Sequence, residues 1–494
     1  MAQIKVSNVT FAYEGSYDNV FENVSFVIDT DWRLGFTGRN GRGKTTFLNL
    51  LLGKYPYKGK ITHSSSFDYF PFDAGDKSRN AIDIVEEVCP DYEYWKISRE
   101  ISLLDLDDSV LFRPFELLSG GEQTKVMLAV LFSKENHFLL IDEPTNHLDE
   151  KAREAMAQYL KSKKGFILVS HDRAFLDTCT DHILSINKNN IEIEQGNFSS
   201  WMENKRRRDD YEMAENSKLK KEIAKLQETA AEKARWSDQV EKSKYHQRVA
   251  GLRVDRGHIG HKSAKMMARS KACEARAQKK AEEKSGLLKN IEKVDVLKIN
   301  PLEYHSKTLG YLKDISVFYG ENTVCRDITF DIKRGERIAL KGPNGCGKSS
   351  ILKLLLGQEI PHTGEFKTGS GLTVSYVSQD TSFLRGNIRS FAEENGLEES
   401  LFKSVLRKLD FSREQFDKDM RSYSEGQKKK VLIAKSLCEK AHLYVWDEPL
   451  NYIDIFSRMQ LEKLILEFQP TLLFVEHDRA FCEKVATKVV VMEG

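Results

Sequence analysis

Short apolar runs alternate with longer stretches of helical spacing along most of this chain. The alternation covers residues 1 to about 200 and returns over residues 301–494, and runs such as 138–141 and 472–475 have the length of buried strands. Both regions are therefore predicted to be α/β domains. No apolar run approaches the roughly 20 residues that a membrane-spanning helix needs, so the sequence predicts a globular chain without a transmembrane segment.

Residues 201–300 differ from both flanks because they have helical period but little core. Two rows of small or apolar residues carry the period: Leu219, Ile223, Leu226, Ala230 and Ala234 in the first half, and Ala264, Ala268, Ala272 and Ala275 in the second. Each row is narrow, and Gly251, Gly257 and Gly260 separate the two stretches. The pattern predicts two long helices packed as an antiparallel hairpin. A helix from about 203 to 242 would be on the order of 60 Å long at 1.5 Å per residue.

The two flanking regions are copies of one another. Five landmarks recur at offsets of 306, 304, 305, 305 and 306 residues: Tyr13, Lys44, Ser119, Glu143 and His171 return as Tyr319, Lys348, Ser424, Glu448 and His477. A repeat that keeps its register to within two residues indicates a duplicated domain. We therefore expect three parts, residues 1–200, 201–300 and 301–494, in which the hairpin joins two copies of one α/β domain.

Charge separates the middle segment from the rest of the chain. The whole sequence has a net charge of only +2, whereas residues 201–300 hold 26 Lys and Arg against 16 Asp and Glu, and residues 241–280 hold 12 against 3. A solvated charged spacer is the simplest alternative, but a spacer does not need its acidic residues depleted near the hairpin tip. Basic, stacking and apolar side chains interleave there, which is typical of an RNA contact. The candidate contact residues are Lys242, Lys244, Tyr245, His246, Arg248, Val249, Leu252, Arg253 and Arg256.

The cysteines indicate a reducing compartment. Seven are scattered through the sequence, at positions 89, 179, 273, 325, 346, 438 and 482, and none forms a CxxC pair. This pattern favours reduced thiols over a zinc or iron–sulfur site. Because residues 1–5 have no apolar signal region, we expect a cytoplasmic protein.

Each flanking domain carries a glycine-rich phosphate loop of the form GxxxxGK[ST]. The loops lie between an apolar strand-like run and a helical stretch, where backbone N–H groups and the lysine can surround phosphates and the hydroxyl can bind Mg²⁺. The first loop supplies Gly38, Asn40, Gly41, Gly43, Lys44, Thr45 and Thr46, and the second supplies Gly342, Asn344, Gly345, Gly347, Lys348, Ser349 and Ser350. Thr45 and Ser349 are the candidate metal ligands. Alone, the motif predicts only the binding of a nucleoside triphosphate.

Two acidic residues end one apolar run in each domain. Asp142 and Asp447 are placed to hold the Mg²⁺ shell, and Glu143 and Glu448 to orient and deprotonate water. His171 and His477 follow the glutamates by 28 and 29 residues. A lone histidine is more often structural, but this spacing from an acidic pair favours a sensor of the γ-phosphate.

Residues 118–123 (LSGGEQ) and 423–427 (YSEGQ) make the prediction more specific. They resemble the signature loop of the ATP-binding cassette (ABC) superfamily, and residues 144–149 (PTNHLD) extend the resemblance. It implies cassettes paired head to tail, so that the nucleotide on each phosphate loop meets the other cassette's signature, here Ser119, Gly120 and Gly121 or Ser424 and Gly426. It also implies that Tyr13 and Tyr319 stack on adenine, unless they are ordinary strand residues.

Two departures from the family pattern fall on one site. Aligning residues 69–73 with 376–380 puts Phe72 where the family has a glutamine that contacts Mg²⁺ and water, represented in the second cassette by Gln379. Glu425 replaces the first glycine of the second signature. Both changes belong to the site built on Lys44, so the two sites are expected to differ in rate or affinity.

The whole chain resembles the ABC-F family, and most closely its Lsa-like antibiotic-resistance branch. Tandem cassettes, a charged interdomain hairpin and the run 260–270 (GHKSAKMMARS) carry this resemblance. It implies an α/β fold of two tandem ABC-type nucleotide-binding domains joined by a long antiparallel helical hairpin, with ATP and Mg²⁺ as cofactors. It also implies a monomer without a membrane subunit that binds the bacterial ribosome.

The resemblance implies what such a protein does there. The hairpin of the family enters the tRNA exit site and approaches 23S rRNA and the P-site tRNA, and this branch protects against lincosamides, pleuromutilins and streptogramin A. The alternative is a housekeeping ABC-F factor that restarts stalled ribosomes. The 75 residues from Lys44 to Ser119 leave no room for the extra arm of such factors, which favours the resistance branch.

Overall fold

The computed structural model describes residues 2–15, 19–146, 148–187, 191–246, 256–287, 297–320 and 322–492. The chain divides into two compact units, one made of Met1–Ser199 and Val294–Gly494 and the other of Ser200–Lys293. In the described part of the chain, no helix combines the length and the apolar character needed to cross a membrane.

The first half of the larger unit is built on a mainly parallel sheet. Its strand order is β5-β6-β7-β3-β8-β9, with only β9 antiparallel to its neighbour. The strands are β5 (Ser66–Phe70), β6 (His137–Asp142), β7 (Phe166–Val169), β3 (Arg33–Thr37), β8 (His182–Ile186) and β9 (Ile191–Gln195). Every residue of β7 is buried, as expected for a central strand covered on both faces.

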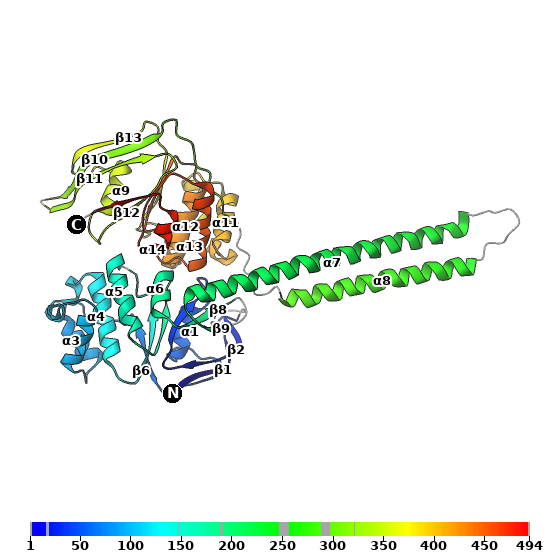
Figure 1. Ribbon diagram of the computed structural model, residues 1–494, viewed down its shortest axis with the longest axis horizontal. Helices are drawn as coiled ribbons and strands as arrows, with labels where there is room; N and C mark the ends of the chain where they lie inside the picture. Colours follow the sequence, from blue (N-terminus) through cyan, green and yellow to red (C-terminus); the bar gives the residue numbers. More distant parts are fainter. Residues whose placement is uncertain are drawn as a thin grey trace. The chain divides into compact units, whose positions relative to one another are not determined.

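An antiparallel sheet and a set of helices complete this half (Figure 1). The sheet has the order β2-β1-β4, from β2 (Phe21–Asp29), β1 (Gln3–Phe11) and β4 (Lys58–Thr62), and it shares one apolar core with β3 and α1. The helices are α1 (Lys44–Leu51), α2 (Ala81–Val88), α3 (Tyr94–Leu103), η1 (Asp108–Phe112), η2 (Phe115–Leu117), α4 (Gly120–Ser133), α5 (Glu150–Lys161) and α6 (Arg173–Cys179).

The second half repeats this plan, with a parallel sheet of order β14-β15-β16-β12-β17 and an antiparallel sheet β11-β10-β13. The strands are β10 (Thr308–Tyr319), β11 (Asn322–Lys333), β12 (Arg337–Lys341), β13 (His362–Thr368), β14 (Val374–Val377), β15 (Leu443–Asp447), β16 (Leu472–Val475) and β17 (Lys488–Val491). The helices are α9 (Lys348–Leu355), α10 (Ile388–Glu394), α11 (Glu399–Lys408), η4 (Arg413–Asp417), η5 (Met420–Ser422), α12 (Glu425–Cys438), α13 (Ile455–Phe468) and α14 (Arg479–Val485). The prediction of two tandem α/β domains is confirmed, and we call them the first and second cassettes.

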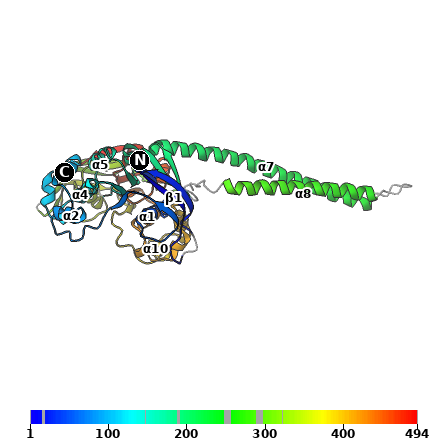
Figure 2. The ribbon, with the colours of Figure 1, turned by 90° about the horizontal axis from the view of Figure 1, so that it is seen from below.

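The smaller unit contains two long helices, α7 (Phe198–His246) and α8 (Arg256–Leu287). They run side by side in both views (Figures 1 and 2), and Ser270 Oγ of α8 donates to the carbonyl of Ala230 in α7 at 2.9 Å. Both helices were expected from the sequence. The hairpin itself stays a prediction, because the residues that would form its turn, 247–255, lie outside the described residues.

The predicted packing row of α8 is wrong by about one position. The four alanines expected to pack, at positions 264, 268, 272 and 275, are exposed, whereas Ser263, Ser270, Cys273 and Ala277 are buried. Both rows have helical spacing, so periodicity could not choose between them. Ser270 can be buried because its hydroxyl donates to a backbone carbonyl of α7.

Candidate nucleotide sites

Both phosphate loops connect the end of a central strand to a helix N-terminus and turn through left-handed glycines. Gly41 and Gly43 have φ of 78° and 95°, and Gly345 and Gly347 have φ of 84° and 86°. A Cβ at Gly43 would lie 2.6 Å from Val20 Cγ1, so only glycine fits there. The backbone N–H groups of each loop therefore lie together at the N-terminus of α1 or α9, where N–H groups and the helix dipole favour a bound anion.

The loop lysines are buried and fold back on their own loops. Lys44 Nζ donates to the carbonyls of Gly38 at 2.8 Å and Arg39 at 3.2 Å, and Lys348 Nζ donates to those of Gly342 and Pro343, both at 2.8 Å. Each ammonium thus stands inside a ring of backbone dipoles. Such a cradle of glycines, N–H groups and one cation fits the phosphates of ATP.

The carboxylates beside these loops fit a divalent cation. Asp142 Oδ2 accepts from Thr45 Oγ1 and from Tyr69 OH, both at 3.0 Å. In the second cassette Asp447 Oδ1 is buried and has no hydrogen-bond partner, and burial raises the pKa of this carboxyl to about 6. A desolvated carboxylate oxygen next to a hydroxyl is a donor set that Mg²⁺ prefers when phosphates complete its shell.

Glu143 and Glu448 occupy strained backbone positions directly after β6 and β15. Their φ angles are 52° and 45°, in the left-handed region that non-glycine residues seldom adopt. The neighbouring strands hold them there, because Glu143 N donates to Val169 O at 2.9 Å and Glu448 N donates to Val475 O at 3.0 Å. Strain of about 1–3 kcal/mol kept in both copies points to a functional orientation of these side chains.

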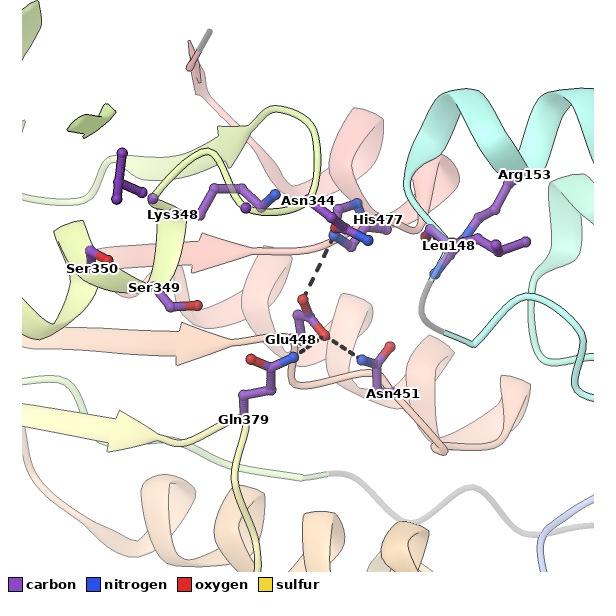
Figure 3. Close-up of a pocket in the computed structure, with 13 residues that line it drawn as sticks. Leu148, Arg153, Asn344, Lys348, Ser349, Ser350, Gln379, Glu448, Asn451 and His477 are labelled. Atoms are coloured by element: carbon purple, nitrogen blue, oxygen red, sulfur yellow. Dashed lines mark hydrogen bonds and ion pairs between the residues drawn. The ribbon is translucent and has the colours of Figure 1, made fainter. Parts of the chain in front are cut away.

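The carboxylate of Glu448 lies in a network of polar side chains (Figure 3). Its Oε2 accepts from Gln379 Nε2 at 2.9 Å and from Asn451 Nδ2 at 2.5 Å, and His477 Nε2 lies 3.7 Å from its Oε1. Burial acts to raise the pKa of Glu448, but His477 and the charges of Lys429 and Lys348 outweigh it and lower the pKa. An ionised carboxylate in this position can accept a proton from water.

Among the residues that the structure describes, no such side-chain network surrounds Glu143. His171 Nε2 approaches its Oε1 at 3.3 Å without hydrogen-bond geometry, and Phe72 replaces the glutamine that orients Glu448. Burial, followed by the charge of Asp142, raises the pKa of Glu143 to about 8. Burial also lowers the pKa of His171, so the histidine supplies no counter-charge. The two sites therefore differ in the pKa of the glutamate carboxyl as well as in sequence.

The pocket at Lys44, of about 620 Å³, contains residues of both cassettes. Tyr13, Asn40, Gly41, Gly43, Lys44, Thr45, Thr46, Asp142, Glu143 and His171 line it from the first cassette, and Ser424, Glu425, Gly426 and Tyr452 line it from the second. The structure thus brings the second signature loop to the first phosphate loop. Asn40 Nδ2 donates to Tyr452 O at 2.8 Å across this junction.

The pocket at Lys348 is about 320 Å³ and differs in what the other cassette contributes. Asn344, Gly345, Gly347, Lys348, Ser349, Ser350, Gln379, Glu448, Asn451 and His477 line it from the second cassette, and Leu148 and Arg153 from the first (Figure 3). Ser119, Gly120 and Gly121 are not among its lining residues, although the family resemblance implied that they would meet this nucleotide.

Tyr13 and Tyr319, which are expected to stack on adenine, have similar positions in the two cassettes, but only Tyr13 lines the pocket at its own phosphate loop. Tyr13 OH lies 2.6 Å from Thr46 Oγ1, and Tyr13 lines the Lys44 pocket. Tyr319 OH lies 3.2 Å from Ser350 Oγ, but Tyr319 is half exposed and does not line the Lys348 pocket. Stacking on adenine remains a prediction for both.

Sequence reasoning missed Tyr69, Asn451 and Tyr452 as pocket residues. Asn451 and Tyr452 fall in residues 449–454, which match the first cassette's 144–149 in position, so the repeat contained a usable signal for them. Tyr69 had none, because its role depends on the pairing of β5 with β6.

The candidate ribosome contacts cannot be placed as side chains. Arg248, Val249, Leu252 and Arg253 lie outside the described residues. Lys242, Lys244, Tyr245, His246 and Arg256 belong to the described backbone of α7 and α8, but their side chains are outside the description.

Two phosphate loops, each beside an acidic strand end, define a protein that binds and hydrolyses ATP with paired cassettes. A family model described as "ABC transporter" matches residues 21–146 and 325–451, just over half of the chain. The chain belongs to this ABC family and is an ABC-F-type ATPase.

Relatives match this chain along almost its full length, and a solved structure shares its fold. The ribosome protection protein VmlR of Bacillus subtilis is 28% identical over 504 residues, covering 99% of this chain and 87% of VmlR. The ATP-binding protein Uup of Buchnera aphidicola is 28% identical over 522 residues, covering 99% of this chain and 80% of Uup. An archaeal ribosome recycling factor, solved with a ribosomal stalk protein, shares the fold with a TM-score of 0.63 at 19% identity, over 99% of this chain and 87% of that one.

Proposed function

We propose that this ATPase binds the bacterial ribosome and protects it from antibiotics of the peptidyl transferase centre, namely lincosamides, pleuromutilins and streptogramin A. The observation that carries the proposal is the full-length similarity to VmlR, whose name describes ribosome protection, because the match includes the segment between the cassettes. The concentration of positive charge in residues 241–280 supports contact with RNA.

In this proposal the chain has three parts, residues 1–200, 201–300 and 301–494. Helices α7 and α8 form one antiparallel hairpin, and its tip, residues 242–259, reaches through the tRNA exit site to 23S rRNA and the P-site tRNA. Tip side chains dislodge the drug, whereas Lys and Arg on the stems provide affinity. The protein acts in the cytoplasm as a monomer without a membrane subunit.

ATP controls how long the protein stays on the ribosome. Thr45 with Asp142, and Ser349 with Gln379 and Asp447, would hold Mg²⁺, which neutralises phosphate charge and positions the γ-phosphate. Glu448 accepts a proton from the attacking water, while Gln379 and Asn451 hold its carboxylate in place. His477 contacts the γ-phosphate and reports its presence. Binding closes the cassettes on the nucleotide, and hydrolysis opens them and releases the ribosome.

A housekeeping role in restarting stalled ribosomes is the alternative. The similarity to Uup and to YdiF of Bacillus subtilis, 27% identical over 97% of this chain, does not distinguish the two roles, because the names of these relatives describe only ATP binding. Both functions use the same ATP chemistry, so only the drug phenotype distinguishes them.

The test is expression in a susceptible bacterium. Inhibitory concentrations of lincomycin and tiamulin should rise, while that of tetracycline, which does not act at the peptidyl transferase centre, should not change. A variant with residues 242–259 replaced by a short Gly-Ser turn should keep its ATPase activity and lose the protection. Unchanged inhibitory concentrations for the wild-type protein would favour the housekeeping role, and full protection by the tipless variant would refute the role of the tip.

A further inference from the structure

The signature helix of the second cassette, α12, lines the Lys44 pocket and contacts the segments that carry Gln379 and Glu448 of the Lys348 pocket. Its first turn lies at the Lys44 pocket, which Ser424, Glu425 and Gly426 line. The approach is close, because a Cβ at Gly426 would lie 2.5 Å from Tyr452 O and 3.1 Å from Asn40 Nδ2 of the first phosphate loop. A movement of the phosphate loop at Lys44 would therefore displace the first turn of α12, because the two are in contact.

One turn further along, Lys429 connects α12 to the other site. This lysine is 2% exposed, and its Nζ donates to the carbonyls of Ser378 at 2.7 Å, Gln379 at 3.4 Å and Asp447 at 3.2 Å. The three acceptors belong to the loop after β14 and to the end of β15. Those two segments present Gln379 and Glu448 to the Lys348 pocket.

Glu425 makes a second link between the same helix and the same loop. Its Oε2 accepts from Thr381 Oγ1 at 2.6 Å, two residues beyond Gln379, while Lys428 Nζ donates to its Oε1 at 2.8 Å. Glu425 thus belongs to the lining of one pocket and holds the loop that carries the glutamine of the other. Glu425, which replaces the usual glycine, therefore anchors the loop that carries Gln379, a role that the sequence pattern did not indicate.

In the described part of the first cassette, none of these links has a counterpart. The residue matching Lys429 is Thr124, whose Oγ1 donates to Gly120 O of its own helix at 2.9 Å. Gly120 itself matches Glu425, and Ala74 matches Thr381. The first cassette therefore lacks counterparts of Lys429, Glu425 and Thr381. Its helix α4 does not make the equivalent connection, which would run from the Lys348 site to the catalytic groups beside Lys44.

We propose that α12 couples the two sites in one direction, with Lys429, Glu425 and Thr381 as positioning residues. Nucleotide at the Lys44 site holds the first turn of α12, and the bridge then holds Gln379 and Glu448 in the geometry that activates water at the Lys348 site. Binding affinities at the two sites are coupled reciprocally, as thermodynamics requires, but the effect on the rate of hydrolysis is confined to the Lys348 site. The inference rests on the proposed roles of Glu143 and Glu448 and not on the ribosome.

A double-mutant cycle tests the coupling. In the Glu143→Gln protein, ATP turnover reports the Lys348 site, and Lys44→Ala disables phosphate binding at the other site. Lys44→Ala should lower kcat by about tenfold when Thr381 is present, and by less than about twofold after Thr381→Val, which removes the hydroxyl but keeps the shape. Equal losses in the two backgrounds, or no loss in either, would overturn the proposal.

Lys429→Met, measured in the same Glu143→Gln protein, tests the positioning role. It should lower kcat by about tenfold with KM altered less than about twofold, because the residue orients groups that act on water and does not touch ATP. Thr124→Ala is the matched control in the first cassette and should change neither. A parallel rise in KM, or an unchanged kcat in a folded Lys429→Met protein, would refute it. If Glu143→Gln and Glu448→Gln together left turnover intact, the assignment of the hydrolytic residues would fail instead.

Discussion

At the scale of single residues, the two copies of the glutamate differ more than their motifs suggest. Both have a left-handed φ and equivalent backbone anchors, yet Glu448 accepts two side-chain hydrogen bonds while Glu143 is buried beside Asp142 with one oxygen unsatisfied. A carboxylate is a useful base only when it is ionised and oriented. The Lys348 site meets both conditions in this structure.

Glu448→Gln should therefore reduce ATPase activity more than Glu143→Gln. Loss of a positioned general base typically costs on the order of 100-fold at the site concerned, so the first variant should retain only the slow turnover of the Lys44 site. Steady-state phosphate release by the two purified variants gives the comparison. Equal residual rates would contradict the asymmetry.

Another residue-scale prediction concerns Glu100, which is 1% exposed in the first cassette. Burial acts to raise the pKa of this carboxyl, but hydrogen bonds from Lys163, Tyr159 and Arg99 outweigh it and lower the pKa below its usual 4.5. A depressed pKa in the folded state means that the stabilisation is complete above about pH 4.5 and is lost as the pH falls through the folded-state value. Glu100→Gln should then lower the free energy of unfolding by about 2 kcal/mol at pH 7.

Thermal unfolding at pH 7 and at pH 4 checks the direction of the pKa shift of Glu100. The midpoint of the Glu100→Gln protein should be lower than that of the wild type at pH 7, and the difference should shrink at pH 4. Glu135→Gln is the control, because Glu135 pairs with Lys96 but is 77% exposed, where ion pairs contribute little. A difference that grew at acid pH would show that the pKa of Glu100 is raised.

At the scale of elements, an ion pair ties the first phosphate loop to the second cassette. Arg39 Nη1 lies 3.2 Å from Asp410 Oδ2, just after α11, and the guanidinium lies 5.6 Å from the ring centroid of Phe456 in α13. The matching positions are Pro343 and Asp105, and a proline cannot make this contact. Among the described residues, the clamp is therefore found at the Lys44 loop and not at the Lys348 loop, which agrees with the closer contact of the Lys44 loop to the opposite signature.

Asp410→Asn should weaken ATP binding at the Lys44 site. Losing a charge-assisted contact to a buried arginine costs about 1.5 kcal/mol, or roughly a tenfold rise in Kd. Titration of a fluorescent ATP analogue into the Lys348→Ala protein, in which the other site is disabled, measures this. Asp105→Asn in the same background is the matched control and should have no effect. An unchanged Kd for Asp410→Asn would show that the clamp does not contribute to binding.

At the scale of the whole molecule, two ATP sites should act as one switch on ribosome binding. The Glu143→Gln, Glu448→Gln double variant keeps both phosphate loops but lacks both candidate bases. It should bind ATP, cease turnover and accumulate on ribosomes, because a bound state that cannot hydrolyse its nucleotide cannot reset. Co-sedimentation with ribosomes in ATP is the measurement. If the double variant sedimented no better than the wild type, hydrolysis would not be the release step.

The sequence alone determined the duplicated α/β domains, their phosphate loops and acidic strand ends, and the helical character of the two segments that form α7 (Phe198–His246) and α8 (Arg256–Leu287). These features are local: a loop that wraps phosphates, a strand that ends in two carboxylates or a row of helical period is encoded by residues close together in the chain. Because the domain is duplicated, the nearly constant offset located the second copy of each motif from the sequence alone.

Only the tertiary structure decided which segments meet. Ser424 and Gly426 reach the Lys44 pocket while Ser119 and Gly120 do not line the Lys348 pocket, although the two signature motifs are similar in sequence. Periodicity could not select the buried row of α8, and no spacing rule pointed to Lys429 and its three carbonyl acceptors. The physical reason is the same in each case: these contacts join residues tens to hundreds of positions apart, and their geometry is set by how packed elements dock.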